Sequence, residues 1–139
     1  MSATSYPLIT TKIRTPRLRQ THLRRERLLN HLHNSIQNKL ILIAAGAGYG
    51  KTSLLIDYAH DTDLPVCWYS LDPHDAHVPT FVEYLVESIR QRFPQFGEPV
   101  RALLQAHDGP PEDVEPFVRV LINEIERTIN TYCVLILDD

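Results

Sequence analysis

The sequence predicts an α/β fold built on a parallel sheet, and three observations support this. A short apolar run at residues 40–44 leads into a glycine-rich segment, which leads into a segment with helical periodicity. Two further apolar runs, at 66–71 and 133–137, are separated by a long stretch with helical patterns. Short continuous apolar runs are typical of strands buried on both faces. Because parallel strands need long and usually helical crossovers, this order favours a parallel sheet with flanking helices.

Before the first strand we expect an arm and a helix. Residues 1–21 are basic, contain Pro16 and show little apolar periodicity, which predicts an extended arm. From about His22 to Gln37, apolar residues recur near the helical period, which predicts the first helix. Its apolar stripe consists of Leu23, Leu28, Leu29, Leu32 and Ile36.

A predicted helix follows each of the first two strands. The helix from Lys51 to His60 has an apolar side, and the strand Val66–Leu71 comes next. After a loop, Thr80 and Glu83 have the spacing of a capping box, which predicts a helix through about Arg92. The inward side of the Lys51–His60 helix carries Leu54, Leu55, Tyr58 and Ala59.

Two more helices occupy the crossover to the last strand. A short helical pattern spans Val100 to Ala106, and the segment 109–111, Gly-Pro-Pro, then breaks the chain. We expect Asp113 to cap a long amphipathic helix with Pro116 in its first turn, where the missing N–H is not needed. The apolar face of this helix carries Val114, Phe117, Val118, Leu121, Ile125 and Ile129.

The glycine-rich segment has the layout of a phosphate-binding loop between a strand and a helix. It reads Ala45-Gly46-Ala47-Gly48-Tyr49-Gly50-Lys51-Thr52. In such loops backbone N–H groups surround phosphate oxygens, the lysine adds a charge for the β and γ phosphates, and the hydroxyl binds the bridging Mg²⁺. The strict pattern begins with glycine where this chain has Ala45, but the three glycines that follow still permit close backbone approach. The alternative is a glycine-rich turn without a ligand. The predicted nucleotide-binding residues are Ala47, Gly48, Tyr49, Gly50, Lys51, Thr52 and Ser53.

The last apolar run delivers two carboxylates, in the layout of a Walker B strand. It ends in Asp138 and Asp139. Ligands of open parallel sheets bind beyond the carboxyl ends of the strands, so we expect these residues to lie near Lys51. Asp138 and Thr52 would then hold Mg²⁺. Lys51 and Asp139 would be catalytic, Asp139 by orienting or deprotonating the water that attacks the γ phosphate.

The composition is that of one globular domain. The chain has 139 residues, is 43% apolar and carries a net charge of -3. Cys67 and Cys133 both fall in predicted buried strands, which indicates free thiols in a reducing compartment. The N-terminus lacks a signal-peptide pattern and no apolar run reaches the length of a membrane span, so we expect a cytoplasmic protein without a membrane partner. Phosphate-loop domains usually continue beyond the Walker B strand. We therefore expect residues 22–139 to be the N-terminal part of a P-loop NTPase domain, truncated after that strand.

The charges are unevenly distributed along the chain. Eight Lys/Arg and one acidic residue precede residue 40, whereas six Lys/Arg and sixteen acidic residues follow it. The basic residues of the arm and first helix either contact nucleic acid or lie on a solvated surface, where they can pair with the acidic part. They include Lys12, Arg14, Arg17, Arg19, Arg24, Arg25 and Arg27.

Several short motifs together resemble the MalT-like, LuxR-type regulators of the STAND class of signalling ATPases. They are Thr11-Lys12, Pro16-Arg17, the run 25–29 (Arg-Glu-Arg-Leu-Leu), the run 47–52 (Ala-Gly-Tyr-Gly-Lys-Thr), the run 68–72 (Trp-Tyr-Ser-Leu-Asp), Asp75, and the run 81–85 (Phe-Val-Glu-Tyr-Leu). The family usually has Ala-Pro where this chain has Ala45-Gly46, which makes this loop more flexible.

The resemblance implies an AAA/NACHT-like ATPase domain that acts as a switch in transcription. ATP would favour an open, self-associating state of the full-length protein and ADP a closed one, with slow hydrolysis between them. Little hydrolysis is expected of these 139 residues alone. By similarity Arg25 reaches the nucleotide, its alternative role being a solvated residue at a helix start. A DNA-binding helix-turn-helix and sensor repeats are implied beyond Asp139.

Other functions and sites remain open at this point. A kinase-like metabolic P-loop enzyme, or a scaffold that no longer binds nucleotide, fits the loop as well; a GTPase is disfavoured because no Asn-Lys-x-Asp run occurs. His74 and His77 with Asp72 and Asp75 could be drawn as a metal site, although a surface loop explains them better. Trp68 is expected in the core rather than on a base. Asp72 remains a weak candidate near the site.

Overall fold

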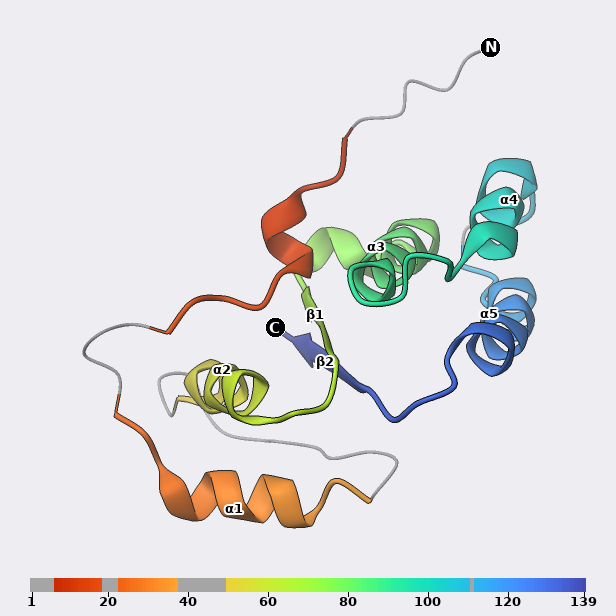
Figure 1. Cartoon of the computed structure of the whole chain (residues 1–139). Coiled ribbons are helices and arrows are strands. Elements are labelled where there is room, and N and C mark those ends of the chain that lie inside the picture. Colours follow the sequence, from red (N-terminus) through yellow and green to blue (C-terminus); the bar gives the residue numbers. More distant parts are fainter. Residues whose placement is uncertain (1–6, 19–22, 38–49, 111) are drawn as a thin grey trace.

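The computed structural model describes residues 7–18, 23–37, 50–110 and 112–139. In these residues two parallel strands lie between two groups of helices (Figure 1). The elements are η1 (Thr10–Ile13), α1 (Glu26–Asn34), α2 (Lys51–Asp61), β1 (Val66–Ser70), η2 (Pro73–Ala76), α3 (Val78–Arg90), α4 (Glu98–Ala106), α5 (Glu115–Thr128) and β2 (Val134–Asp138). The α/β class predicted from the sequence is confirmed. The predicted strand at 40–44 lies outside the described residues.

The two strands pair in parallel and in register from end to end. Val66 lies opposite Val134, and Ser70 lies opposite Asp138. The crossover between them contains α3, α4 and α5, as a parallel pair requires. Both carboxyl ends therefore lie at the same edge of the sheet, where the sequence predicted the site.

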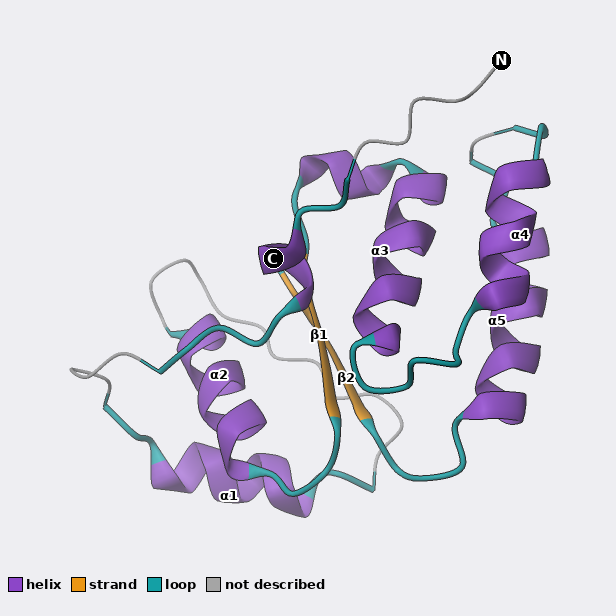
Figure 2. Cartoon of the chain, turned by 45° about the horizontal axis from the view of Figure 1, so that its top comes forward, coloured by secondary structure: helices purple, strands orange, loops and turns teal. Residues whose placement is uncertain are grey.

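One face of the sheet is covered by α1 and α2 (Figure 2). The core on this side combines Leu29 and Leu32 of α1 with Leu54 and Tyr58 of α2. The inward side predicted for α2 is confirmed. The first helix is shorter than predicted: it begins at Glu26, and Leu23 is exposed. Its apolar contacts with the core come from Leu28, Leu29 and Leu32, the middle of the expected stripe.

On the other face α3 covers β1, with α4 and α5 packed beyond it (Figure 2). The predicted capping box at Thr80 and Glu83 is wrong, because α3 begins at Val78 with no side-chain cap. The capping box belongs instead to Asp72 and Asp75 at the start of η2. This side of the core contains Cys67, Val82, Val86, Ile89, Phe96, Val100 and Phe117.

The predicted start of the last helix is also corrected. Val114 is the N-cap residue of α5, and Asp113 accepts a hydrogen bond from the Glu115 N–H at 3.2 Å without capping the helix. Pro116 does lie in the first turn, as expected. The predicted apolar face is only partly buried: Phe117 is in the core, whereas Val114, Val118 and Ile125 are exposed.

The junction between α3 and α4 depends on one glycine. Gly97 has φ +93°, and a Cβ added there would lie 2.5 Å from Cγ1 of Val86. Its N–H donates to Glu124 at 2.8 Å, a buried carboxylate of α5. The hydrogen bond from Arg127, together with that from Gly97, lowers the pKa of Glu124. The hydrogen bond between Gly97 and Glu124 fixes α5 against the α3–α4 turn.

The described part of the arm is folded onto the sheet rather than uniformly extended. Thr10–Ile13 forms a short 3-10 helix, and Lys12 and Ile13 are buried. None of the helices in the described ranges is long and apolar enough to span a membrane.

Candidate functional site

The structure brings the start of α2 and the end of β2 together. The Thr52 hydroxyl lies within hydrogen-bond distance of both carboxylate oxygens of Asp138, at 3.1 and 3.0 Å. These residues are 86 positions apart in sequence. The contact joins the residue after Lys51 to the first carboxylate of the predicted Walker B pair. The predicted neighbourhood of Thr52 and Asp138 at one edge of the sheet is thus found in the fold.

The negative charge of Asp138 at this edge is only partly compensated by its neighbours. Burial raises the pKa of Asp138, and the neighbouring charge of Asp139 raises it further, while the Thr52 hydrogen bond and the charge of Lys51 act against the rise. A carboxylate with a raised pKa lacks full compensation by positive charge. A cation bound here would supply that compensation.

The first turn of α2 is a helix N-terminus, which is a favourable place for an anion. Gly50, with φ 76°, is its N-cap residue and provides no side-chain cap. The first N–H groups of a helix have no partner within the helix, and the helix dipole favours negative charge there. Lys51, Thr52 and Ser53 form this turn. The predicted loop residues Ala47, Gly48 and Tyr49 lie outside the described residues.

Arg25 lies directly against the end of the glycine-rich segment. Its Nη2 donates to the Gly50 carbonyl at 2.5 Å, and a Cβ added at Gly50 would lie 3.1 Å from both terminal guanidinium nitrogens. Arg25 is the N-cap residue of α1. The first helix therefore places a guanidinium beside the predicted site, and contact of Arg25 with the nucleotide stays a prediction.

A cavity opens at the same edge of the sheet, on the side of η2. It has a volume of about 560 Å³, and Asp139 forms part of its wall. The remaining wall residues are Leu71, Asp72, Pro73, Asp75, Ala76 and Phe81. This cavity was not predicted from the sequence, because its wall combines the η2 turn with a residue far away in the chain.

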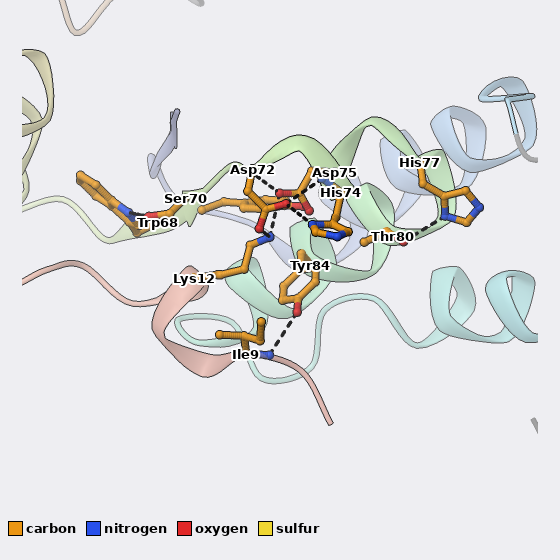
Figure 3. Close-up of polar contacts among 11 residues, drawn as sticks. Ile9, Lys12, Trp68, Ser70, Asp72, His74, Asp75, His77, Thr80 and Tyr84 are labelled. Atoms are coloured by element: carbon orange, nitrogen blue, oxygen red, sulfur yellow. Dashed lines mark hydrogen bonds and ion pairs between the residues drawn. The ribbon is translucent and has the colours of Figure 1, made fainter. Parts of the chain in front are cut away.

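Two alternatives raised by the sequence find no support. No group of three or more His, Cys, Asp or Glu in the described ranges could hold a metal ion. His74 Nδ1 lies 3.2 Å from Asp72, whereas His77 turns away to Thr80 (Figure 3). Trp68 is buried in the core and its Nε1 donates to the Ser70 hydroxyl at 2.7 Å. Core packing was the role expected for Trp68.

Lys12 was missed as a structural residue because its sequence context is that of a basic arm. It is buried and forms ion pairs with Asp72 and Asp75 (Figure 3). Asp72, predicted as a weak candidate near the site, lies in this cluster at the edge of the sheet. The available signal was the position of Lys12 next to the apolar residue Ile13, which is also buried.

The fold and this edge define an α/β protein in which a helix beginning with Lys-Thr meets the acidic end of a parallel strand. The sequence of the chain is similar to that of the HTH-type transcriptional regulator MalT. Against MalT of Yersinia pestis (strain Pestoides F) it is 36% identical over 100 residues, which are 72% of this chain and 11% of the relative. Against MalT of Klebsiella pneumoniae it is 40% identical over 85 residues, 60% of this chain and 9% of the relative.

The similarity confirms the resemblance drawn from the motifs, and it has a defined extent. This chain spans about a tenth of the length of the curated relatives that it matches. No model of a known protein family matches the sequence.

Proposed function

We propose that this chain is an ATP-binding switch module of a MalT-type transcription regulator, with the core of a cytoplasmic P-loop NTPase. The observation that carries the proposal is the contact between Thr52 and Asp138 at the start of α2. The similarity to MalT supports the regulatory half of the proposal. The glycine-rich sequence before Lys51 supports the nucleotide half.

The residues at this edge suit a magnesium nucleotide. The Thr52 hydroxyl and the Asp138 carboxylate are oxygen ligands of the kind that Mg²⁺ prefers, and they already lie within 3.1 Å of each other. Thr52 and Asp138 would hold the Mg²⁺ of the nucleotide, which would supply positive charge against the phosphates. The first turn of α2 and the ammonium of Lys51 would bind the phosphates.

The remaining predicted residues have defined roles in this proposal. Residues 47–50 and Ser53 would contribute backbone and hydroxyl donors to the phosphates. Asp139, on the wall of the cavity, would orient the attacking water. Arg25, beside Gly50, would contact the nucleotide or hold the end of the loop that does. ATP hydrolysis would be slow, because its role is to reset the switch rather than to turn over a metabolite.

In this proposal the whole protein binds nucleotide and DNA through different segments. ATP and ADP would bind here and shift the population between an associating state and a closed state. Contact with DNA would belong to a helix-turn-helix outside these 139 residues, as the name of the relatives suggests. Nucleotide-dependent self-association would likewise be a property of the full-length protein.

The test is titration of the chain with ATP and ADP, with and without Mg²⁺, by calorimetry. Lys51→Ala should weaken binding at least about tenfold, since it removes a charge from the phosphates. Asp138→Asn should abolish most of the gain that Mg²⁺ provides. Arg119→Ala is the matched control: it also removes a cation, from the exposed ion pair with Glu115 on α5.

Two results would contradict the proposal. One is that the wild-type chain binds neither nucleotide with Mg²⁺. The other is that Lys51→Ala binds as tightly as Arg119→Ala.

A further inference from the structure

Lys12 is buried in a way that lysine seldom is. It is only 8% exposed, and its Nζ lies 2.7 Å from Asp72 Oδ2 and 2.8 Å from Asp75 Oδ2 (Figure 3). The ammonium also lies 4.5 Å from the centre of the Tyr84 ring. Lysine is almost never fully buried unless it is paired. The cluster is therefore a specific binding site for this one side chain of the arm.

Asp75 is the centre of the cluster and depends on Lys12 for its charge. Its side chain is 3% exposed. Its Oδ2 accepts hydrogen bonds from Lys12 and from the Asp72 N–H at 2.7 Å, and its Oδ1 accepts one from the Tyr69 hydroxyl at 2.6 Å. Burial opposes its ionisation, but these hydrogen bonds outweigh burial and lower the pKa of Asp75. Lys12 is the only cation among these three donors.

The arm is attached at two further points around Lys12. The Ile9 N–H donates to the Tyr84 hydroxyl at 3.1 Å (Figure 3). Ile13 is buried in a cluster with Tyr69 and Tyr84. The segment 9–13 is thus bound to β1 and α3 through polar and apolar contacts at once.

The residues that Lys12 holds are connected directly to the candidate nucleotide site. Asp72 follows Leu71, whose N–H donates to the Asp138 carbonyl at 2.6 Å. The Asp138 carboxylate in turn contacts Thr52. The η2 turn that begins after Asp72 also forms one wall of the cavity that Asp139 borders. A shift of this turn would therefore move the ends of both strands.

We infer that Lys12 is a positioning residue for the nucleotide site. By binding Asp72 and Asp75 it ties the arm to the edge of the sheet and fixes the η2 turn against Asp138 and Asp139. The inference rests on the proposed nucleotide function. It assigns a role in that function to the arm, which was predicted from the sequence only as a basic extended segment.

The inference predicts a specific pattern in a Lys12→Met variant. Methionine keeps most of the length of the side chain and removes the charge that Asp75 needs. The affinity for ATP in the presence of Mg²⁺ should fall about tenfold, while the affinity for ATP without Mg²⁺ should change less than about twofold, because Lys12 acts through Asp138. A general loss of structure would lower both affinities together. Arg14→Met, an exposed arm residue two positions further, is the matched control and should change neither.

A double variant separates two effects of Lys12, the attachment of the arm to the η2 turn and the neutralisation of the Asp75 carboxylate. Lys12→Met with Asp75→Asn removes the uncompensated buried carboxylate and should recover much of the thermal stability lost in Lys12→Met. The loss of the Mg²⁺-dependent affinity should persist, because the arm is still not tied to the turn. Full recovery of both properties would mean that Lys12 only neutralises Asp75, and would overturn the inference.

Hydrogen exchange followed by mass spectrometry tests the tether without nucleotide. The peptide covering residues 7–18 should exchange several-fold faster in Lys12→Met and in the double variant than in the wild type or Arg14→Met. Unchanged exchange would overturn the inference even if nucleotide binds. If the wild type binds no nucleotide but exchange does rise, the proposed function and the positioning role both fail, and Lys12 is left as a residue of the fold.

Discussion

The two strands of the sheet pair residue for residue, yet they differ in what covers them. On the side of α3, Cys67 and Tyr69 of β1 are 1% and 0% exposed. Their partners in β2, Leu135 and Leu137, are 42% and 45% exposed. Neighbouring strands with similar apolar sequences therefore occupy different environments on one face.

The difference lies in the reach of α3. On the side of α1 and α2 the strands are alike, because Trp68 and Ile136 are both in the core. On the other side α3 packs against β1, and in the described part of the chain no element covers the corresponding face of β2. An apolar run in a sequence thus predicts a strand with a buried side, but it does not predict which element will cover that strand.

The strongest test of this contrast is a pair of alanine variants, Trp68→Ala in β1 and Leu135→Ala in β2. Trp68→Ala should lower the free energy of unfolding by about 3–5 kcal/mol, because it leaves a large cavity between α2 and the sheet. Leu135→Ala should cost less than about 1 kcal/mol, since the side chain is already half in water. Urea unfolding followed by circular dichroism measures both. Equal costs would show that β2 is covered in solution as fully as β1.

The carboxylates at the ends of the two strands should respond to pH with opposite signs. Beside β1, Asp75 has a lowered pKa, so its contribution to stability is present above the ordinary value of 3.8 and is lost as the pH falls through the folded pKa. At the end of β2, Asp138 has a raised pKa, so its contribution is present below 3.8 and is lost as the pH rises through the folded pKa.

Asparagine variants separate these two contributions. At pH 7 Asp75→Asn should be destabilised by about 2 kcal/mol, because Lys12 and Tyr69 lose a buried acceptor. Asp138→Asn should be more stable than the wild type at the same pH. Thermal unfolding between pH 3 and 7 checks both directions. Loss of stability in Asp138→Asn at pH 7 would mean that the Thr52 contact outweighs the cost of burying the charge.

Much of the fold can be predicted from the periodicity of apolar residues and from the residues that break helices and strands. The helix after Lys51, the strand from Val66 and the helix near Val100 were predicted within a few residues, because each has a clear apolar pattern and a clear break. The caps were predicted poorly. Thr80 and Asp113 have suitable side chains, but Pro79 starts α3 earlier, and Val114 takes the N-cap position of α5.

The site is predictable to the extent that its residues form a linear motif. The meeting of Thr52 with Asp138 follows from the rule that parallel strands present their carboxyl ends at one edge. The Lys12 cluster does not follow, because its members come from the arm, β1, η2 and α3 and no spacing connects them. From its charge alone, Lys12 was predicted to lie on the surface. In the structure it is buried, because it donates hydrogen bonds to Asp72 and Asp75.

A smaller effect is expected from removing one hydroxyl on the buried side of β1. Tyr69→Phe keeps the ring but deprives Asp75 of one donor, so it should cost about 1–2 kcal/mol. The loss should shrink as the pH falls and Asp75 becomes protonated. Urea unfolding at pH 7 and at a pH well below 3.8 provides the comparison, because the pKa of Asp75 is lowered from that value. A cost that does not change with pH would indicate that the ring packing, not the hydroxyl, was disturbed.

The smallest effect should come from making the open face of β2 polar. Leu137→Thr places a β-branched strand former opposite Tyr69 and removes apolar surface that is nearly half exposed. The change in the free energy of unfolding should stay within about 0.5 kcal/mol, because little buried area is lost. Light scattering at increasing concentration should also show less association, since exposed apolar patches favour contacts between molecules. A destabilisation above 2 kcal/mol would erase the contrast between the strands, because it would mean that Leu137 is packed as tightly as Tyr69.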